Sequence, residues 1–422
     1  MVDRVRAIPA RYRSPLAVAV ALLGLSAASS FHVPLLPEIT RSLDLSVGDV
    51  GVFATVFAVG RLAADLPAGR LIDARGASAT LAGGAVALGL GTAVLTAADA
   101  RGWLLASASV IGVGSALANT SGMAYFSTIS SNRRRAKSMS VYAVGLLGGQ
   151  AIGPAVSGLL EGLGGWRVAT GAVPLLVLAI GVVLWAFGPR RTSQSAARPA
   201  GEGEGVTVLS AGARVILGLV PFAVSFGLIG VGQTLVPVIG AVEHDLRPAV
   251  IGTVLGIAGV ARLVGALLAG VVADRKSRKS ALVPGLVLQA AGIGMVQLLP
   301  TVPGWVAATV VMSAASYGVV IGATVLGDGV PRDELGRRLG RYRLVGDLGF
   351  VAGPAAAAHF LGQGQNASML GLASGLLMVA AILVVIGVPE THEQQRTVFN
   401  RGARPYNRLH TVRTTSQEPP CD

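Results

Sequence analysis

The feature that most limits how this chain can fold is an internal repeat about two hundred residues long. The same residue types recur in both halves of the 422-residue sequence. At an offset of 201 residues the pairs are Arg61 and Arg262, Leu62 and Leu263, Ala68 and Ala269, Gly69 and Gly270, and Asp73 and Asp274; at an offset of 200 they are Tyr142 and Tyr342, Gly149 and Gly349, Gly153 and Gly353, and Pro154 and Pro354. Charges and glycines keep the same register, so the sequence predicts two copies of one structural unit.

Each copy consists mainly of apolar segments that are long enough to cross a membrane. Charged residues make up 13% of the chain, whereas a typical soluble domain carries roughly 25%. A helix that spans a bilayer needs about 20 mostly apolar residues. Twelve segments meet this requirement: 15–36, 48–68, 78–98, 103–128, 139–161, 167–188, 214–240, 249–271, 280–299, 304–327, 342–361 and 367–388. We expect an all-α integral membrane fold of twelve transmembrane helices in two pseudo-symmetric six-helix bundles.

The distribution of basic residues predicts the orientation of these segments. If both termini are cytoplasmic, 28 of the 34 Lys and Arg residues lie on the inner side and four in outer loops, as the positive-inside rule requires. An N-terminal secretory signal is an alternative for the first segment, although its apolar run is long enough to span. The expected parts are a cytoplasmic N-terminus (1–14), a first bundle (15–188), a cytoplasmic linker (189–213), a second bundle (214–388) and a disordered cytoplasmic tail (389–422).

Several function classes are disfavoured by what the sequence lacks. The one cysteine, Cys421, leaves no internal disulfide, and the five histidines form no pair at helical spacing. No P-loop sequence is present for ATP, and no nucleophile–base set or carboxylate pair suggests an enzyme. The basic residues are not gathered on one face as in a nucleic-acid-binding protein. We expect no cofactor, no metal and no nucleic-acid partner.

The loop after the second segment and its counterpart after the eighth share a motif. The motif residues are Gly69, Asp73, Arg75 and Gly76 in the first copy, and Gly270, Asp274, Arg275, Arg278 and Lys279 in the second. This motif resembles the loop signature of the major facilitator superfamily, and the resemblance covers residues 15–388. It implies a gating loop that latches when the cavity opens outward. Ala74 and Ser277 depart from the family pattern, and simple capping of helix ends by the aspartates is the alternative.

The fifth segment carries glycines at every fourth position and then a proline. The motif residues are Gly145, Gly149, Gly153, Pro154 and Gly158. The pattern is similar to the motif of the drug:proton antiporter branch of the superfamily, which implies export. Generic close packing of helices is the alternative, since small residues let helix backbones approach. In the fourth segment Ala108 replaces the arginine that the family associates with proton transfer, and this departure weakens the proton assignment.

Five charged residues fall inside the predicted segments: Arg61, Asp65, Arg262, Arg343 and Asp347. Because ionisable groups at membrane depth are costly, each is a functional candidate. The resemblance places the second and eleventh segments opposite each other, so we expect an Arg61–Asp347 ion pair that couples the two halves. Local pairing of Arg61 with Asp65 is the alternative. Leu147 occupies the position equivalent to Asp347, so Arg262 has no matching acid and Asp347 is the leading candidate for proton binding.

The same resemblance assigns the first, fourth, seventh and tenth segments to a central cavity. The candidate lining residues are Ser29, His32, Asn119, Tyr125, Gln233, Ser316 and Tyr317. His32 could titrate near neutral pH, but an interfacial position beside Phe31 and Pro34 is the alternative. Deep in these four segments the sequence places hydroxyl, amide and apolar groups and no acid. The expected substrate is therefore a neutral or amphipathic organic molecule rather than a cation.

The leading interpretation is a monomeric secondary transporter in a bacterial plasma membrane. It would export a drug or metabolite in exchange for protons, by rocking of two bundles about a central site. A nutrient importer or facilitator of the same fold is the second possibility, and a membrane sensor or assembly factor without transport is the third. The expected partners are the small-molecule substrate, protons and the lipid bilayer.

Overall fold

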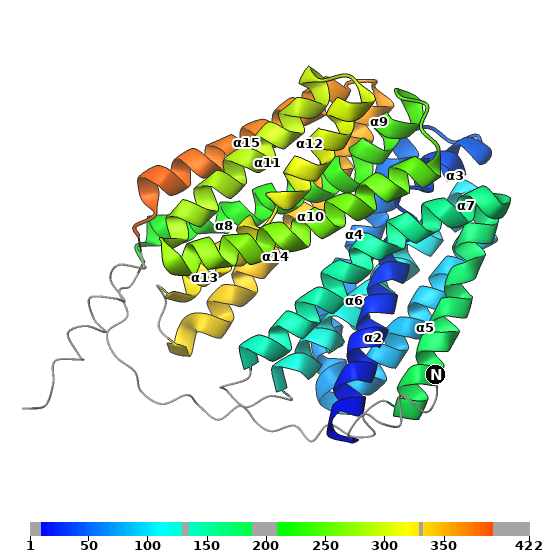
Figure 1. The fold of residues 1–422 in the computed structure, drawn as a ribbon, viewed down its shortest axis with the longest axis horizontal. Coiled ribbons are helices and arrows are strands. Elements are labelled where there is room, and N and C mark those ends of the chain that lie inside the picture. Colours follow the sequence, from blue (N-terminus) through cyan, green and yellow to red (C-terminus); the bar gives the residue numbers. More distant parts are fainter. Residues whose placement is uncertain (1–9, 129–134, 188–208, 329–331, 391–422) are drawn as a thin grey trace, which may run out of the picture.

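The structure is a computed structural model, and it describes residues 10–128, 135–187, 209–328 and 332–390. Every regular element in these ranges is a helix (Figure 1). In chain order they are α2 (Ala10–Ser30), α3 (Leu36–Ser42), α4 (Gly48–Arg75), α5 (Ala77–Thr96), α6 (Arg101–Thr128), α7 (Arg135–Phe187), α8 (Ala211–Ser225), the π-helix η2 (Phe226–Leu235), α9 (Val236–Val242), α10 (Pro248–Arg275), α11 (Arg278–Leu298), α12 (Val302–Ala314), α13 (Gly318–Asp328), α14 (Arg332–Gly362) and α15 (Asn366–Gly387). The expected all-helical architecture is confirmed.

The number of membrane crossings is lower by strict criteria than the twelve expected. Within the described ranges nine helices are long and apolar enough to cross a bilayer, and ten if bent α4 counts as one span. Two features explain the difference. Helix α7 is 53 residues long but leaves helical geometry at Gly164 and Gly165, where Gly165 has φ of 80°, a conformation that favours glycine. The apolar part of α2 is a shorter helix, Pro15–Ser30, so the count of twelve stays a prediction.

Several expected segments begin, end or break elsewhere than expected. Helix α14 begins at Arg332 rather than at 342. The seventh segment is divided into α8, η2 and α9, and the tenth into α12 and α13 by turn residues 315–317. Helix α8 begins at Ala211, where Ser210 caps it by accepting a hydrogen bond from the Ala213 amide, as a helix N-cap requires. Residues 1–9, most of the expected linker (188–208) and the tail from 391 lie outside the described residues.

The helices form two groups that follow the two halves of the sequence. In the first half α2 packs on α7, and α6 packs on both α4 and α5; in the second, α11 packs on α12 and α15, and α14 on α8. The groups contact each other mainly through two helix pairs, α4 with α14 and α7 with α10, with smaller contacts of α3 with α9 and of α4 with η2. In Figure 1 the groups converge near α3 and α9 and diverge toward the opposite end.

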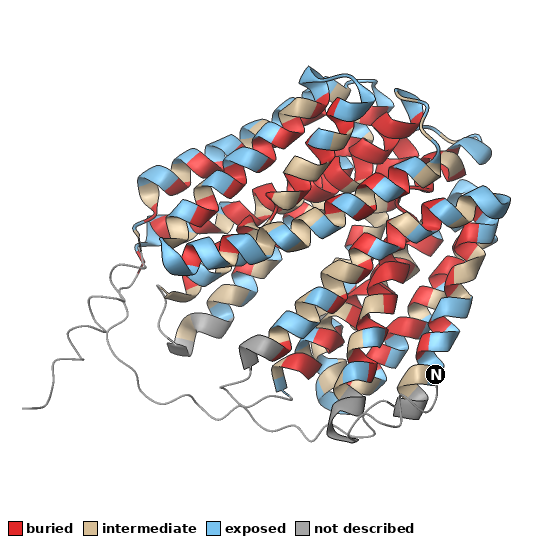
Figure 2. Ribbon diagram, in the orientation of Figure 1, coloured by how far each residue is buried: buried red, intermediate tan, exposed pale blue. Residues whose placement is uncertain are grey.

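The burial pattern is that of helices surrounded by lipid. Buried residues face the interior of each group, and exposed ones lie on the outside (Figure 2). Many exposed side chains are large and apolar, including Leu163, Leu175 and Ile386, which are 77%, 69% and 79% exposed. An apolar surface this extensive is unusual for a soluble monomer. It suits the acyl chains of a bilayer.

Candidate functional site

Glycines bring the two halves into contact along two seams, the α4–α14 seam and the α7–α10 seam. At the first, a Cβ added to Gly51 would lie 2.5 Å from the Ala358 Cα. At the second, a Cβ added to Gly259 would lie 2.7 Å from the Ala151 Cα. Only residues without a side chain permit such approaches between helix backbones. The expected facing of the second and eleventh segments is therefore present.

A cluster of charged groups lies at the α4–α14 seam. Arg343 on α14 reaches across the seam, with its Nη2 3.4 Å from Asp65 Oδ1 on α4. Its Nε lies 3.9 Å from Asp347 Oδ2, one turn along α14. The Thr120 hydroxyl of α6 donates a 2.9 Å hydrogen bond to Asp65 Oδ1. One arginine thus serves two carboxylates, and the pair with Asp65 joins the two halves.

The expected Arg61–Asp347 ion pair is not formed among the described residues. The ion pair across the seam runs instead from the basic residue of α14 to the acidic residue of α4. Arg61 lies over the Phe350 ring, with Cζ 4.8 Å from the ring centroid, and its buried Nε has no hydrogen-bond partner. Depth along each helix was the basis of the expectation, and depth does not specify the rotation of one helix against the other.

The α7–α10 seam repeats this arrangement without the acids. Arg262 on α10 donates a 3.2 Å hydrogen bond from Nη1 to Gln150 Oε1 on α7. Gln150 lies 200 residues before Phe350, the residue that Arg61 contacts. Both arginines therefore contact the equivalent residue of the opposite half. The repeat predicted from the sequence extends to these contacts.

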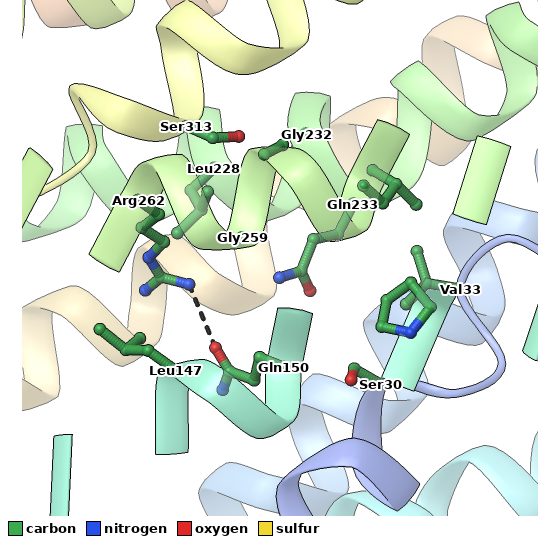
Figure 3. A pocket seen from close by; sticks show the side chains of 13 residues that line it. Ser30, Val33, Leu147, Gln150, Leu228, Gly232, Gln233, Gly259, Arg262 and Ser313 are labelled. Carbon is green, nitrogen blue, oxygen red and sulfur yellow. Dashed lines mark hydrogen bonds between the residues drawn. The ribbon is translucent and has the colours of Figure 1, made fainter. Parts of the chain in front are cut away.

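A cavity lies between the two halves beside Arg262. It contains about 520 Å³ of empty space, part of which is open to solvent. Its walls come from α2, α7, η2, α10 and α12, so both halves contribute (Figure 3). Its polar lining residues are Ser30, Gln150, Gln233, Arg262 and Ser313. In Figure 3 the Arg262 guanidinium and the Gln233 amide both point into the space between the halves.

Of the expected cavity residues, Gln233 lines this cavity and Ser29 and Asn119 line a smaller one beside Arg61. The smaller cavity has about 220 Å³ of empty space, and Gln150 lines both. The Ser29 hydroxyl donates to the Ser26 carbonyl of its own helix, and the Asn119 amide oxygen accepts from the Tyr142 hydroxyl.

The other four expected cavity residues contribute to packing. His32 is buried, with its ring centroid 4.9 Å from that of Phe53, and its Nδ1 has no partner. Tyr125 is buried edge-on against Phe126. The Ser316 hydroxyl donates to the Ser313 carbonyl. Tyr317 is half-buried, and its ring occupies the space above Gly285.

The sequence did not predict the roles of three residues. These are Gln150, which accepts a hydrogen bond from Arg262, Phe350, which contacts Arg61, and Tyr142, which donates a hydrogen bond to Asn119. Gln150 is the one amide among the glycines of the fifth segment, between Gly149 and Gly153. A polar side chain on such a bare helix face is a detectable signal. Phe350 occupies the equivalent place in the second half, and the repeat could have paired the two.

The two loop motifs lie at the end where the groups diverge. In the first, Gly76 separates α4 from α5 with φ of 87°, while Asp73 and Arg75 are exposed. Gly69 and Gly270 each have open space where a Cβ would be. Neither glycine is therefore in close contact with the opposite half.

The second loop is bound to the helices around it. Arg278 lies 2.6 Å from Asp274 and 3.1 Å from Asp328 at the end of α13. The Lys279 Nζ donates a 2.8 Å hydrogen bond to the Val385 carbonyl of α15. Arg275, the remaining motif residue, is the exposed last residue of α10.

The glycines of the fifth segment have a packing role that is repeated in the second half. A Cβ on Gly149 would meet the Leu23 carbonyl of α2, and one on Gly349 would meet the Phe222 carbonyl of α8. Their neighbours also pack within a half: Gly153 faces Ala27, Gly353 faces Phe226, and Gly145 lies on Leu22. The last residues of the motif pack between the halves, since Gly158 contacts Pro248 and Pro154 contacts Gly252 across the α7–α10 seam. Most of the motif therefore packs helices within a half, and its last residues pack the two halves together.

Comparison with known proteins agrees with this architecture. The chain is 27% identical over 177 residues to the putative uncharacterized transporter YgaY of Escherichia coli strain K12. It is equally similar to the uncharacterized transporter YgaY of E. coli O157:H7. Each match spans 41% of this chain and 44% of the relative.

Among solved structures, a bacterial homolog of the human lysosomal transporter Spinster, inward-facing and occupied, has a TM-score of 0.73 at 16% identity, covering 90% of this chain and 97% of that one. The human organic anion transporter MFSD10 has a TM-score of 0.63 at 17% identity, covering 89% of this chain and 100% of that one. At these identities the likeness is one of fold.

A family model covers nearly the whole chain in two overlapping matches, residues 18–246 and 217–415. Its description is the Major Facilitator Superfamily. Each match contains most of one of the two halves that the repeat and the seams define. The chain is therefore a member of the Major Facilitator Superfamily, a family of transporters rather than enzymes.

Proposed function

We propose that the protein is a secondary active transporter that exports a small amphipathic organic molecule in exchange for protons. The observation that carries the proposal is the Arg343–Asp65 ion pair, because it joins the two halves and contains a group that can bind a proton. The protein would act as a monomer, without a cofactor, in a bacterial plasma membrane with both termini in the cytoplasm. The gating loops, seams and cavity described above would be its working parts.

Alternating access would follow from the arrangement of the seams. Close glycine contacts hold the halves together at one end, at Gly51 on Ala358 and at Gly158 on Pro248. At the other end Gly69 and Gly270 have no neighbour at the Cβ position. With the orientation that the basic residues favour, the open end faces the cytoplasm, where an exporter collects its substrate. Rocking of the halves would then open the glycine seams and close the motif loops.

Proton binding would act on the ion pair between the halves. Asp65 Oδ2 is buried without a hydrogen-bond partner, so a proton there would not displace a bond. The groups that face this carboxylate are Arg343 of α14 and Thr120 of α6. The guanidinium of Arg61 and the neutral hydroxyl of Tyr142 lie nearby. Protonation would remove the charge that holds Arg343 at the seam. Asp347 would act as the second carboxylate for the same arginine.

An importer or facilitator is the second candidate, and two observations favour it. The glycine packing that suggests export is repeated in the second half, so it is a property of the duplicated fold. Ala108 is fully buried where the family pattern has an arginine. The direction of transport therefore has to be measured. Export predicts substrate uptake into inside-out vesicles.

The test uses the purified protein in liposomes that contain the pH dye pyranine. A panel of amphipathic compounds is added outside, and a coupled exchanger should change the internal pH when a transported compound enters. Asp65→Asn should abolish this pH change while retaining counterflow of the compound. Transport without any pH change in the wild type would contradict proton coupling, and no transport of any compound would contradict the function.

A further inference from the structure

The charged groups around the cavity do not balance. In the described membrane-spanning helices this region holds three arginines and two aspartates: Arg61, Arg262, Arg343, Asp65 and Asp347. Arg343 serves both carboxylates, and Arg61 lies within electrostatic reach of Asp347. One positive charge remains without a counter-charge. An uncompensated charge at membrane depth is costly, and such groups are usually paired or functional.

The surplus charge lies at Arg262. Its one hydrogen bond to a described side chain is with the neutral amide of Gln150, and no described carboxylate lies within 4.0 Å of it. Leu147, which lines the same cavity, occupies the position equivalent to Asp347. Arg61 is close enough to repel Arg262 electrostatically. A guanidinium has five N–H donors, so most of its hydrogen-bonding capacity is available to a ligand.

Tilting of the halves would not bring an acid to Arg262. The acidic residues of α7 and α10 are Glu161 and Asp274. Glu161 is eleven residues from Gln150, or about 16 Å along a helix, and Asp274 is twelve residues from Arg262, or about 18 Å. The described residues of α2, α8 and η2 contain no Asp or Glu. Among the described residues, the helices that line the cavity therefore hold no acid close to Arg262, and an external anion can supply the missing negative charge.

The cavity has the composition that an anionic amphiphile requires. Around Arg262 the side chains of Gln150, Gln233 and Ser313 can donate hydrogen bonds to oxygens. Leu228, Leu255 and Val33 provide an apolar wall next to them. Figure 3 shows the guanidinium and both amides facing the same space. Charge-assisted hydrogen bonds from arginine to a carboxylate, sulfonate or phosphate oxygen are strong and directional.

We infer that the cavity binds an organic anion, with Arg262 as the charge partner of the anionic head group and the leucine-lined wall in contact with its apolar body. This inference rests on the proposed transport function and specifies the substrate class. It also changes the expectation from the sequence, in which the cavity suits a neutral or amphipathic molecule. The anionic head group supplies the charge that the lining lacks.

The test compares three aromatic probes of similar size and different charge: toluenesulfonate, toluenesulfonamide and benzyltrimethylammonium. Binding to the purified full-length protein is measured as a shift in thermal stability over a concentration series. The anion should bind best. Arg262→Gln should weaken anion binding by about tenfold or more, because a hydrogen bond to a charged group is lost. Arg262→Lys should retain the preference for the anion, since it keeps the charge.

Arg247→Gln is the matched control, because it removes one exposed positive charge at the outer end, away from this cavity. It should leave all three affinities unchanged. Equal or stronger binding of the neutral or cationic probe to the wild type would overturn the inference, as would an unaltered anion affinity in Arg262→Gln. A wild type that binds none of the probes would also count against it. If Arg262→Gln cannot be purified, the order of the probes in the wild type decides.

Counterflow in liposomes separates this inference from the transport function. Anion binding without counterflow of any solute would contradict transport and leave the anion site in place. Counterflow of neutral solutes with no preference for anions would contradict the site and leave transport in place.

Discussion

The α4–α14 and α7–α10 seams are built on the same plan and differ in charge. Both use glycine contacts at one end, and both place an arginine against the opposite half, Arg61 on Phe350 and Arg262 on Gln150. The α4–α14 seam also holds Asp65, Arg343 and Asp347, which form ion pairs with one another. The equivalent positions 266, 143 and 147 are Ala, Ala and Leu. Duplication preserved the scaffold, and divergence placed the acids on one side only.

This difference suggests a division of labour between the seams. The α4–α14 seam contains two carboxylates that can bind protons, and both lie beside an arginine. The α7–α10 seam contains a cation with an amide partner and an adjoining cavity. In our proposal the first seam senses protons and the second binds the substrate. Substitutions that make the seams more alike or remove one feature test this division.

The largest effect is expected from breaking the ion pair between the halves. Asp65→Asn and Arg343→Gln should each lower the free energy of unfolding by about 2–3 kcal/mol. This cost is smaller than that of breaking a fully buried ion pair, because the Arg343 side chain is 38% exposed. The double variant should lose less than the sum, since the Asp65 charge that Arg343→Gln leaves without its partner is then absent as well. Stability in detergent and the pyranine assay report the two consequences.

Arg41→Gln provides the control for this cycle. It removes an exposed ion pair with Glu38 at 3.4 Å, which is worth about 0–1 kcal/mol. Additive losses from Asp65→Asn and Arg343→Gln would show that the pair does not couple the halves.

A smaller effect is expected from filling the glycine contacts. Gly259→Ala and Gly51→Ala place a Cβ 2.7 Å and 2.5 Å from the facing backbone, and overpacking of this kind costs about 1–3 kcal/mol. The two seams should respond alike. Gly69→Ala, which has open space around the Cβ position, should be neutral or stabilising by up to about 1 kcal/mol through helix propensity.

Thermal stability and cross-linking of cysteine pairs placed on either side of each seam measure these effects. If Gly69→Ala lowers the stability as much as Gly259→Ala does, Gly69 is also in close contact with a neighbouring helix in detergent, and the two ends of the seams do not differ as described.

A third substitution adds the missing acid to the α7–α10 seam. Leu147→Asp places a carboxylate on the cavity wall beside Arg262, at the position equivalent to Asp347. The new charge should compete with an external anion, so the half-saturating concentration of toluenesulfonate should rise about tenfold. Leu147→Asn, of similar size without the charge, should change it much less. Equal effects of the two variants would point to shape rather than charge.

The sequence predicted the repeat, the helical architecture and the charged positions because these depend on patterns along the chain. Arg61 and Arg262 were identified from their register alone, and the structure places both at seams between the halves. The choice of partners could not be predicted in the same way. Whether Asp65 meets Arg343 or Arg61 depends on the rotation of α4 against α14, which a periodicity does not specify.

Cavity residues were the weakest part of the prediction. Serines such as Ser29 and Ser316 hydrogen-bond to carbonyls of their own helices, a common behaviour in apolar surroundings. Gln150 was overlooked because the interpretation of the fifth segment as an antiporter-like motif rests on its glycines and Pro154 alone. The breaks that divide the seventh and tenth segments also depend on tertiary contacts and have no clear signal in the sequence.

The smallest effect is expected from exchanging the neutral partners of the two arginines. Phe350→Gln gives Arg61 an amide partner like the one that Arg262 has. It replaces a cation–π contact worth about 0.5–1 kcal/mol with one hydrogen bond to a charged group, worth about 1.5–3 kcal/mol. Loss of the ring from the apolar contact with Phe57, at 6.4 Å between centroids, offsets part of that gain. Thermal stability should therefore change by less than about 1 kcal/mol, while Phe350→Ala, which gives Arg61 no partner, should cost more. If Phe350→Gln is as harmful as Phe350→Ala, the ring is needed for its shape and the two arginines are not held in equivalent ways.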